Sequence, residues 1–250
     1  MIRLVILGAG TAIPIPGYSP AGHLVQIGDM LLLFDIGPGT LSRLAAAGFD
    51  YRQLDTIFIT HHHPDHTLDL VTLLQAYDST PGWVRRDALR LVGGRGTTLF
   101  YKQLMAAYPD IGVTSYHLDL QEMGEDRLVF PEWSVSAALT GHTSNSLGYR
   151  LEAEGKSIVF SGDATLTPGL VNLAEQADIF ICECSFPGDG ASSDHLAAGQ
   201  VGWLAQVAGV KRLVLVHLYP PALKVDLISL VREEYSGQAE IATDGLALSL

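Results

Sequence analysis

The 250-residue sequence has little positive charge. Lysine and arginine together number 15 against 27 aspartate and glutamate residues, which gives a formal net charge of −12. A protein that binds nucleic acid over a broad surface neutralises phosphates with basic side chains. The composition therefore argues against broad electrostatic contact with nucleic acid, although a single phosphate ester held at a metal site is compatible with it.

Cysteine and long apolar runs are also scarce. Cys182 and Cys184 lie two residues apart, too close for an ordinary disulfide. We expect two small buried thiols rather than a redox or metal pair, and a cytoplasmic protein, because thiols stay reduced inside the cell. No apolar run reaches the roughly 18 residues that a membrane span needs. The apolar start is soon interrupted by glycine, and it fits a first strand better than a signal peptide.

Short apolar runs rich in β-branched residues alternate with helical patterns along the whole sequence, and 48% of the residues are hydrophobic. This predicts a single α/β domain over residues 1–250 with mixed sheets. The expected strands are Arg3–Leu7, Leu24–Ile27, Leu31–Asp35, Thr56–Thr60, Leu89–Val92, Ser134–Leu139, Leu147–Glu152, Ser157–Ser161, Ile179–Cys184 and Leu213–His217. The expected helices are Thr40–Ala47, Leu68–Tyr77, Thr97–Tyr108, Ala197–Ala208 and Lys224–Tyr235. A hairpin turn is expected at Glu154-Gly155-Lys156.

Histidine is abundant, with nine residues, and several follow one predicted strand directly. The segment after that strand contains His61, His63, Asp65 and His66. Imidazole and carboxylate groups are ligands that suit zinc, so this spacing indicates a metal site, and a solvated surface loop is the alternative. His61 and His63 can bind one ion while Asp65 and His66 turn toward a second.

Three further strand ends carry a residue of the same kind. His142, Asp163 and His217 each stand at the carboxyl end of a predicted strand. A lone histidine is more often structural than a metal ligand. Four strand ends with ligand-type residues point to one centre, because α/β folds present functional groups at strand ends.

The pattern resembles the metallo-β-lactamase superfamily, whose signature His-x-His-x-Asp-His stands here as His61, His63, Asp65 and His66. The resemblance implies an αβ/βα four-layer sandwich in which two mixed β-sheets are flanked by helices. It also implies two divalent metal ions, zinc first, with manganese or iron as alternatives. The first ion would take His61, His63 and His142, the second Asp65, His66 and His217, and Asp163 would bridge them.

Within that superfamily the sequence resembles the ribonuclease Z-like branch, which includes small phosphodiesterases. The matching blocks include Leu7–Pro14, Leu33–Gly39, Ser161–Asp163 and Asp194–Ala198. The branch implies a dinuclear hydrolase in which a hydroxide held between the ions attacks a phosphodiester. Asp65 and His195 would be its catalytic residues. His195 would contact the phosphate or protonate the leaving oxygen. The alternative is a purely structural role for His195 as a neighbour of a helix cap.

The sequence departs from ribonuclease Z proper in two ways. That enzyme carries a long arm that grips transfer RNA between the third histidine and the bridging aspartate, whereas only Thr143–Gly162 separate these positions here. The family's His-Ser-Thr block also reads His195-Leu196-Ala197. Together with the acidic charge, this favours a small phosphodiester over nucleic acid as the substrate. A homodimer is expected from the resemblance alone.

Other functions stay open at this point. The same metal pair would serve a lactonase, a thioesterase, an arylsulfatase or a transfer RNA 3′-processing endonuclease without an arm. A non-catalytic metal-binding module predicts an incomplete ligand set, whereas all seven positions are filled here. Asp35 either orients a ligand histidine or caps a turn. We expect His62 to point away from the ions.

Overall fold

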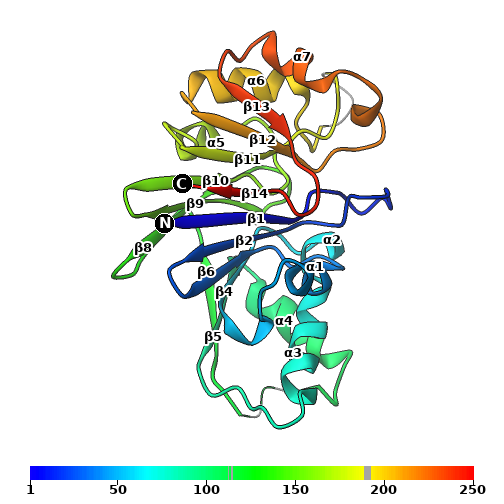
Figure 1. Ribbon diagram of the computed structural model, residues 1–250, viewed down its shortest axis with the longest axis vertical. Helices are drawn as coiled ribbons and strands as arrows, with labels where there is room; N and C mark the ends of the chain where they lie inside the picture. The colour runs from blue at the N-terminus through cyan, green and yellow to red at the C-terminus, as the bar shows by residue number, and fades with distance from the viewer. Residues whose placement is uncertain (112, 114, 189–192) are drawn as a thin grey trace.

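Two β-sheets form the centre of the computed structural model, which describes residues 1–111, 113, 115–188 and 193–250 (Figure 1). The first sheet has seven strands in the order β14-β1-β2-β3-β4-β5-β6, and the second has seven in the order β13-β12-β11-β10-β9-β8-β7. The first comprises β1 (Ile2–Gly8), β2 (Gly22–Ile27), β3 (Met30–Phe34), β4 (Leu54–Ile59), β5 (Leu89–Gly94), β6 (Leu118–Met123) and β14 (Ala247–Ser249). The second comprises β7 (Arg127–Val129), β8 (Trp133–Leu139), β9 (Leu147–Ala153), β10 (Lys156–Phe160), β11 (Ile179–Glu183), β12 (Arg212–Val216) and β13 (Gln238–Ile241).

Both sheets are mixed. Strands β3 to β6 run parallel to one another, as do β10 to β13, and the remaining neighbours pair antiparallel. Parallel strands point their carboxyl ends to the same edge. Residues that follow β3 and β4 in one sheet, or β10 and β12 in the other, are therefore brought to a common edge.

Helices cover the outer face of each sheet (Figure 1). The first sheet is flanked by α1 (Thr40–Ala46), α2 (Pro64–Thr67), α3 (Asp69–Ser79) and α4 (Thr97–Ala106). The second is flanked by α5 (Pro168–Leu173), α6 (Ala198–Val207) and α7 (Leu227–Arg232). Two short 3-10 helices occupy Tyr51–Gln53 and Ala222–Lys224. The layer order is helix, sheet, sheet, helix, so the expected four-layer sandwich is confirmed.

The inner faces of the two sheets pack against each other around stacked aromatic rings. The Phe34 ring of the first sheet lies 4.0 Å from the Phe160 ring of the second, centroid to centroid. Within β1, Leu4 faces this inner core while Val5 faces the helices. Because side chains alternate across a strand, burial of both faces requires an unbroken apolar run. That requirement explains why these strands lack polar alternation.

All ten predicted strands exist, with ends within about two residues, and the hairpin turn is confirmed. Glu154 and Gly155 both have positive φ (49° and 71°), as a two-residue hairpin of this hand requires. The helix predicted over Lys224–Tyr235 is too long, because the chain forms a 3-10 turn first and α7 covers only Leu227–Arg232.

The two cysteines are free and fully buried, as predicted. Within the described ranges, no helix combines the length and the hydropathy that a membrane crossing demands.

Candidate metal centre

The histidine-rich segment begins where β4 ends. Thr60 closes the strand, and α2 starts at Pro64, a position where proline fits because the first helical turn needs no backbone donor. The His66 backbone N–H donates to the His63 carbonyl at 3.1 Å. This single turn carries Asp65 and His66 inward, and both side chains are largely buried.

The second sheet supplies the facing residues. His142 follows β8, Asp163 follows β10 and His217 follows β12. His217 adopts a left-handed backbone with φ 57°, a strained conformation for a non-glycine residue that is typical of functional sites. Its backbone N–H donates to the Ala9 carbonyl at 2.8 Å. The cluster therefore lies at the seam between the sheets, with side chains contributed by both.

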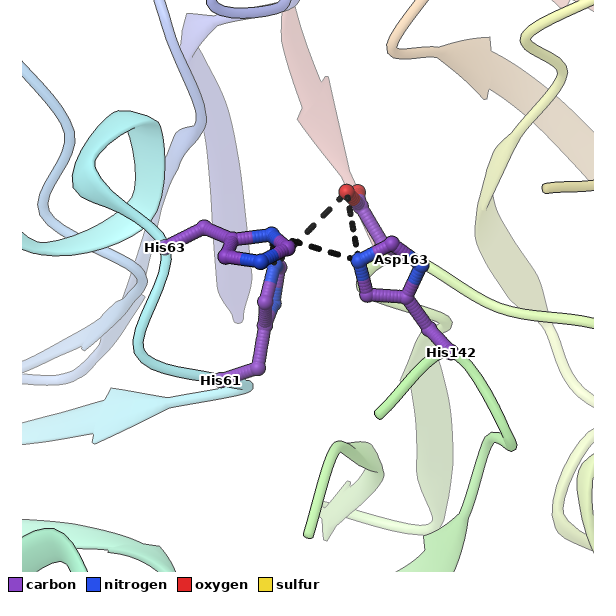
Figure 2. Close-up of side chains that lie close together, drawn as sticks. All are labelled: His61, His63, His142 and Asp163. Atoms are coloured by element: carbon purple, nitrogen blue, oxygen red, sulfur yellow. Dashed lines mark hydrogen bonds and ion pairs between the residues drawn. The ribbon is translucent and has the colours of Figure 1, made fainter. Parts of the chain in front are cut away.

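Four side chains meet at one point of this seam, as Figure 2 shows for His61, His63, His142 and Asp163. His63 Nδ1 lies 2.9 Å from His61 Nε2 and 3.2 Å from His142 Nε2. Asp163 Oδ2 lies 3.7 Å from Nε2 of both His61 and His142. Three imidazole nitrogens and one carboxylate oxygen converge, which is a donor set that could hold a divalent cation.

A second group meets on the other side of the same carboxylate. Asp163 Oδ1 lies 3.3 Å from Nε2 of both His66 and His217. Asp65 Oδ2 lies 3.8 Å from His66 Nε2 and 3.7 Å from His217 Nε2. Three of these buried atoms, His66 Nε2, His217 Nε2 and Asp163 Oδ1, lack a hydrogen-bond partner among the described residues. Buried polar atoms are normally satisfied, so their common aim fits a bound cation.

The charges of the site also suit metal ligands. Burial would raise the pKa of Asp163, but the facing His217 and His66 hold it well below the usual range. Burial lowers the pKa of His61, and the nearby His66 lowers it further. An ionised carboxylate beside the neutral His61 ring is the form in which both groups bind a cation. Burial would lower the pKa of His66, but Asp163 and Asp35 raise it well above the usual range, so this ring would release a proton when it binds a cation.

The remote nitrogen of several imidazoles is fixed by the surrounding chain. His66 Nδ1 donates to Asp35 Oδ2 at 2.7 Å, and Asp35 is itself held by the Thr60 backbone N–H and hydroxyl at 2.8 and 2.9 Å. His142 Nδ1 donates to the Asp194 carbonyl at 2.8 Å. Such contacts fix the ring orientation of ligand histidines. Of the two roles considered for Asp35, the structure favours the orienting one.

His195 lies beside the cluster, just before α6. Its Nδ1 is 3.1 and 3.2 Å from the two carboxylate oxygens of Glu183 and 4.0 Å from Asp163 Oδ2. Burial alone would lower the pKa of His195, but the hydrogen bond and charge of Glu183 raise it. His195 can therefore hold a proton at the edge of the site.

Glu183 was missed by the sequence analysis, although it is fully buried at the end of β11. Its carboxylate accepts hydrogen bonds from the Ala164 and Leu196 backbone N–H groups, and from the Ser185 hydroxyl. The sequence did offer a signal for Glu183, because it is a charged residue between two cysteines in an otherwise apolar strand. A charged side chain is buried only where the protein provides partners for it, so such a position indicates a specific role.

The remaining histidines lie elsewhere. His62 points away from the cluster, as predicted, stacking on Phe100 at 4.6 Å while its Nε2 lies 2.9 Å from the Thr97 hydroxyl. His117 is exposed. His23 is only 6% exposed, and burial lowers its pKa to about 3. Its Nδ1 lacks a hydrogen-bond partner among the described residues.

Comparison with known proteins identifies the family. Residues 21–200 match the model of the metallo-beta-lactamase superfamily. The chain belongs to the metallo-β-lactamase superfamily. Its relatives in that superfamily include a ribonuclease Z of Mycobacterium avium, 30% identical over 276 aligned residues that cover 98% of this chain and 96% of that protein. The resemblance to the ribonuclease Z-like branch is thereby confirmed.

Solved structures of the superfamily share the fold. YhfI from Bacillus subtilis, a metallo-beta-lactamase fold protein, matches with a TM-score of 0.84 at 23% identity, over the full length of both chains. A diphosphatase from the PhnP family matches with a TM-score of 0.78 at 16% identity, over 100% of this chain and 98% of that one. At these identities the likeness establishes the fold.

Proposed function

We propose that this protein is a dinuclear metal-dependent hydrolase that acts on a small phosphodiester. The observation that carries the proposal is the position of the Asp163 carboxylate, whose two oxygens face different pairs of histidines. One carboxylate can thus serve two ion sites. The residues proposed to hold the first ion are His61, His63 and His142, and those for the second are Asp65, His66 and His217, with Asp163 shared. Zinc is the proposed metal.

When bound, two divalent ions activate water and neutralise the charge that develops on a phosphodiester. Side chains of the protein would accept and donate the protons that this reaction transfers. The Asp65 carboxylate can accept the proton that the attacking water loses. His195, protonated and held through Nδ1 by Glu183, can give its proton to the leaving alcohol oxygen. One bond from phosphorus to water oxygen forms, and the bond to the leaving oxygen breaks.

Three features support a small substrate. The net charge is −12, which opposes broad binding of a polyanion. The residues between His142 and Asp163 are taken up by β9, β10 and their tight turn, so no arm projects there. The alignment with the Mycobacterium avium ribonuclease Z spans 276 positions, more than the 250 residues of this chain, so that relative carries segments that this chain lacks.

A transfer RNA 3′-processing endonuclease is the second candidate. It is favoured by the ribonuclease Z relative, whose match extends over nearly all of both proteins. The two candidates share the metal centre, so they differ only in the substrate that this centre can reach.

The test combines metal analysis with a substrate panel. We expect two tightly bound divalent ions per chain and hydrolysis of bis(4-nitrophenyl) phosphate that a chelator abolishes. At most one ion per chain with no ester hydrolysis would refute the proposal, and activity confined to a lactone, thioester or aryl sulfate would refute the substrate class. Faster cleavage of a precursor transfer RNA than of any small diester would establish the second candidate.

The role proposed for His195 has its own variant. We expect His195→Ala to lower turnover of diphenyl phosphate, whose phenol needs a proton to leave readily, about 10²-fold or more, with the metal content unchanged. His62→Ala is the matched control, because His62 points away from the cluster. Loss of metal from His195→Ala would contradict the proton-donor role.

A further inference from the structure

An apolar groove opens beside the metal centre. Its volume is about 670 Å3, within the range of small-molecule sites. Five prolines, Pro64 among them, line it together with Ile15, Tyr18 and Asp65. Asp65 is the one charged residue among the described residues that line it. The same residue faces His66 and His217 across the metal centre, so the groove adjoins the metal centre at Asp65.

The groove wall is braced and preformed. The loop between β1 and β2 closes on itself where the Gly10 N–H donates to the Ser19 carbonyl at 2.7 Å. The Asp244 carboxylate, 2% exposed, accepts from the Ser19 N–H at 2.8 Å and pairs with Arg43 at 3.1 Å. Proline rings fix φ along the loop. A wall held in this way costs a ligand little ordering entropy.

Two hydroxyl groups of the groove already have hydrogen-bond partners. The Thr11 hydroxyl accepts from the Ile13 N–H at 3.0 Å, and the Ser19 hydroxyl accepts from Arg43 Nε at 3.3 Å. Among the described lining residues there is no lysine or arginine. A polynucleotide arm would need cations for its phosphates, so the lining is complementary to an uncharged, apolar group.

We infer that this groove is a specificity subsite for an apolar aryl or alkyl ester group of the substrate whose phosphodiester lies at the metal centre. The inference rests on the proposed function. It narrows the substrate class to diesters with one uncharged apolar substituent, and it assigns Ile15 as a residue that determines that preference through contact with the substituent.

The test varies the second ester group while the leaving group stays the same. Benzyl, methyl and thymidine-5′ esters of 4-nitrophenyl phosphate all release 4-nitrophenolate. We expect kcat/KM for the benzyl ester to exceed that for the methyl ester by at least roughly tenfold, the discrimination that burial of apolar groups provides. In Ile15→Asn this ratio should fall several-fold. Val84→Asn, which changes an exposed apolar residue outside the groove, should leave the ratio and the activity unchanged.

The outcomes separate the inference from the proposed function. Hydrolysis of all three esters with a benzyl-to-methyl ratio near one, or with the thymidine ester preferred, overturns the subsite and leaves the phosphodiesterase standing. If no ester is hydrolysed, the proposed function fails, and the groove is tested by calorimetric titration with dibenzyl and dimethyl phosphate. Tighter dibenzyl phosphate binding that Ile15→Asn weakens supports the groove, and equal binding overturns it.

Discussion

Replacement of Glu183 by glutamine tests the proton-donor part of the proposed mechanism most directly. Glu183 is 0% exposed, and hydrogen-bond donors of neighbouring residues surround its carboxylate. One of these donors is His195 Nδ1 at 3.1 Å. Glutamine keeps the size of the side chain but removes the charge, and its amide N–H₂ would face at least one of these donors. A donor left without an acceptor in a buried site costs about 1–3 kcal/mol of the free energy of unfolding.

The larger effect should fall on turnover. A hydrogen bond to a charged group contributes about 1.5–3 kcal/mol, and Glu183 forms such a bond with His195 Nδ1. Glu183 raises the pKa of His195, so its replacement lowers that pKa, and the protonated donor is lost at lower pH. The alkaline limb of the kcat/KM profile should therefore move to lower pH, and kcat at neutral pH should fall about 10- to 100-fold.

The assay is a pH–rate profile for diphenyl phosphate, whose phenol, unlike 4-nitrophenol, needs a proton to leave readily near neutral pH, with metal content measured on the same samples. Glu152→Gln is the matched control, because it makes the same change on a partly exposed carboxylate of the second sheet that pairs with Arg127. Unchanged turnover and an unshifted alkaline limb at full metal content would refute the proton-donor role. Loss of metal in Glu183→Gln would show instead that Glu183 serves ion retention.

Three more predictions follow from other contacts. Asp35→Asn should weaken metal binding about 10- to 100-fold, because His66 Nδ1 loses its hydrogen-bond acceptor at 2.7 Å. Asparagine tolerates the φ of 62° at this position, so the backbone should keep its conformation. Competition with a chromogenic chelator measures the change in metal affinity. His62→Ala should retain both metal and activity, so a loss of bound metal would contradict its placement against Phe100. Burial would raise the pKa of Asp178, but hydrogen bonds from Lys211 and Ser157 lower it, so Asp178→Asn should cost about 1 kcal/mol in urea unfolding at pH 7. That cost should begin to shrink as the pH falls below about 3.9, the pKa of the unfolded carboxyl, and should vanish only below the lower pKa of the folded one; a cost that persists in strong acid would contradict the reasoning.

The sequence predicted the central elements of the fold because their burial leaves a pattern. Strands such as β3 and β12 are covered by the other sheet on one face and by helices on the other. Their sequences are therefore unbroken apolar runs. The strands that were missed, β6, β7, β13 and β14, are short or partly exposed. Their residues pair mainly through the backbone at or near sheet edges, which constrains side-chain identity only weakly.

The candidate ligands were predictable for a different reason. His61, His142, Asp163 and His217 stand at strand ends, and parallel strands bring such ends together. Glu183 was not predictable in the same way, because its role depends on the approach of His195 across 12 residues of chain. The proline-lined groove likewise depends on how the loop after β1 folds against Asp65. The assignment of one domain, the homodimer and the choice of zinc stay predictions that sedimentation and metal analysis can test.

An ion held at the seam would tie the lifetime of the protein to metal supply. His61, His63, Asp65 and His66 come from the first sheet, whereas His142, Asp163 and His217 come from the second. An ion that binds only the assembled pair of sheets stabilises the native state by about 2.7 kcal/mol at a concentration 100 times its dissociation constant. Metal shortage would remove that stabilisation, and a larger fraction of chains would unfold and be degraded. Metal shortage would then lower the amount of this protein as well as its activity per molecule.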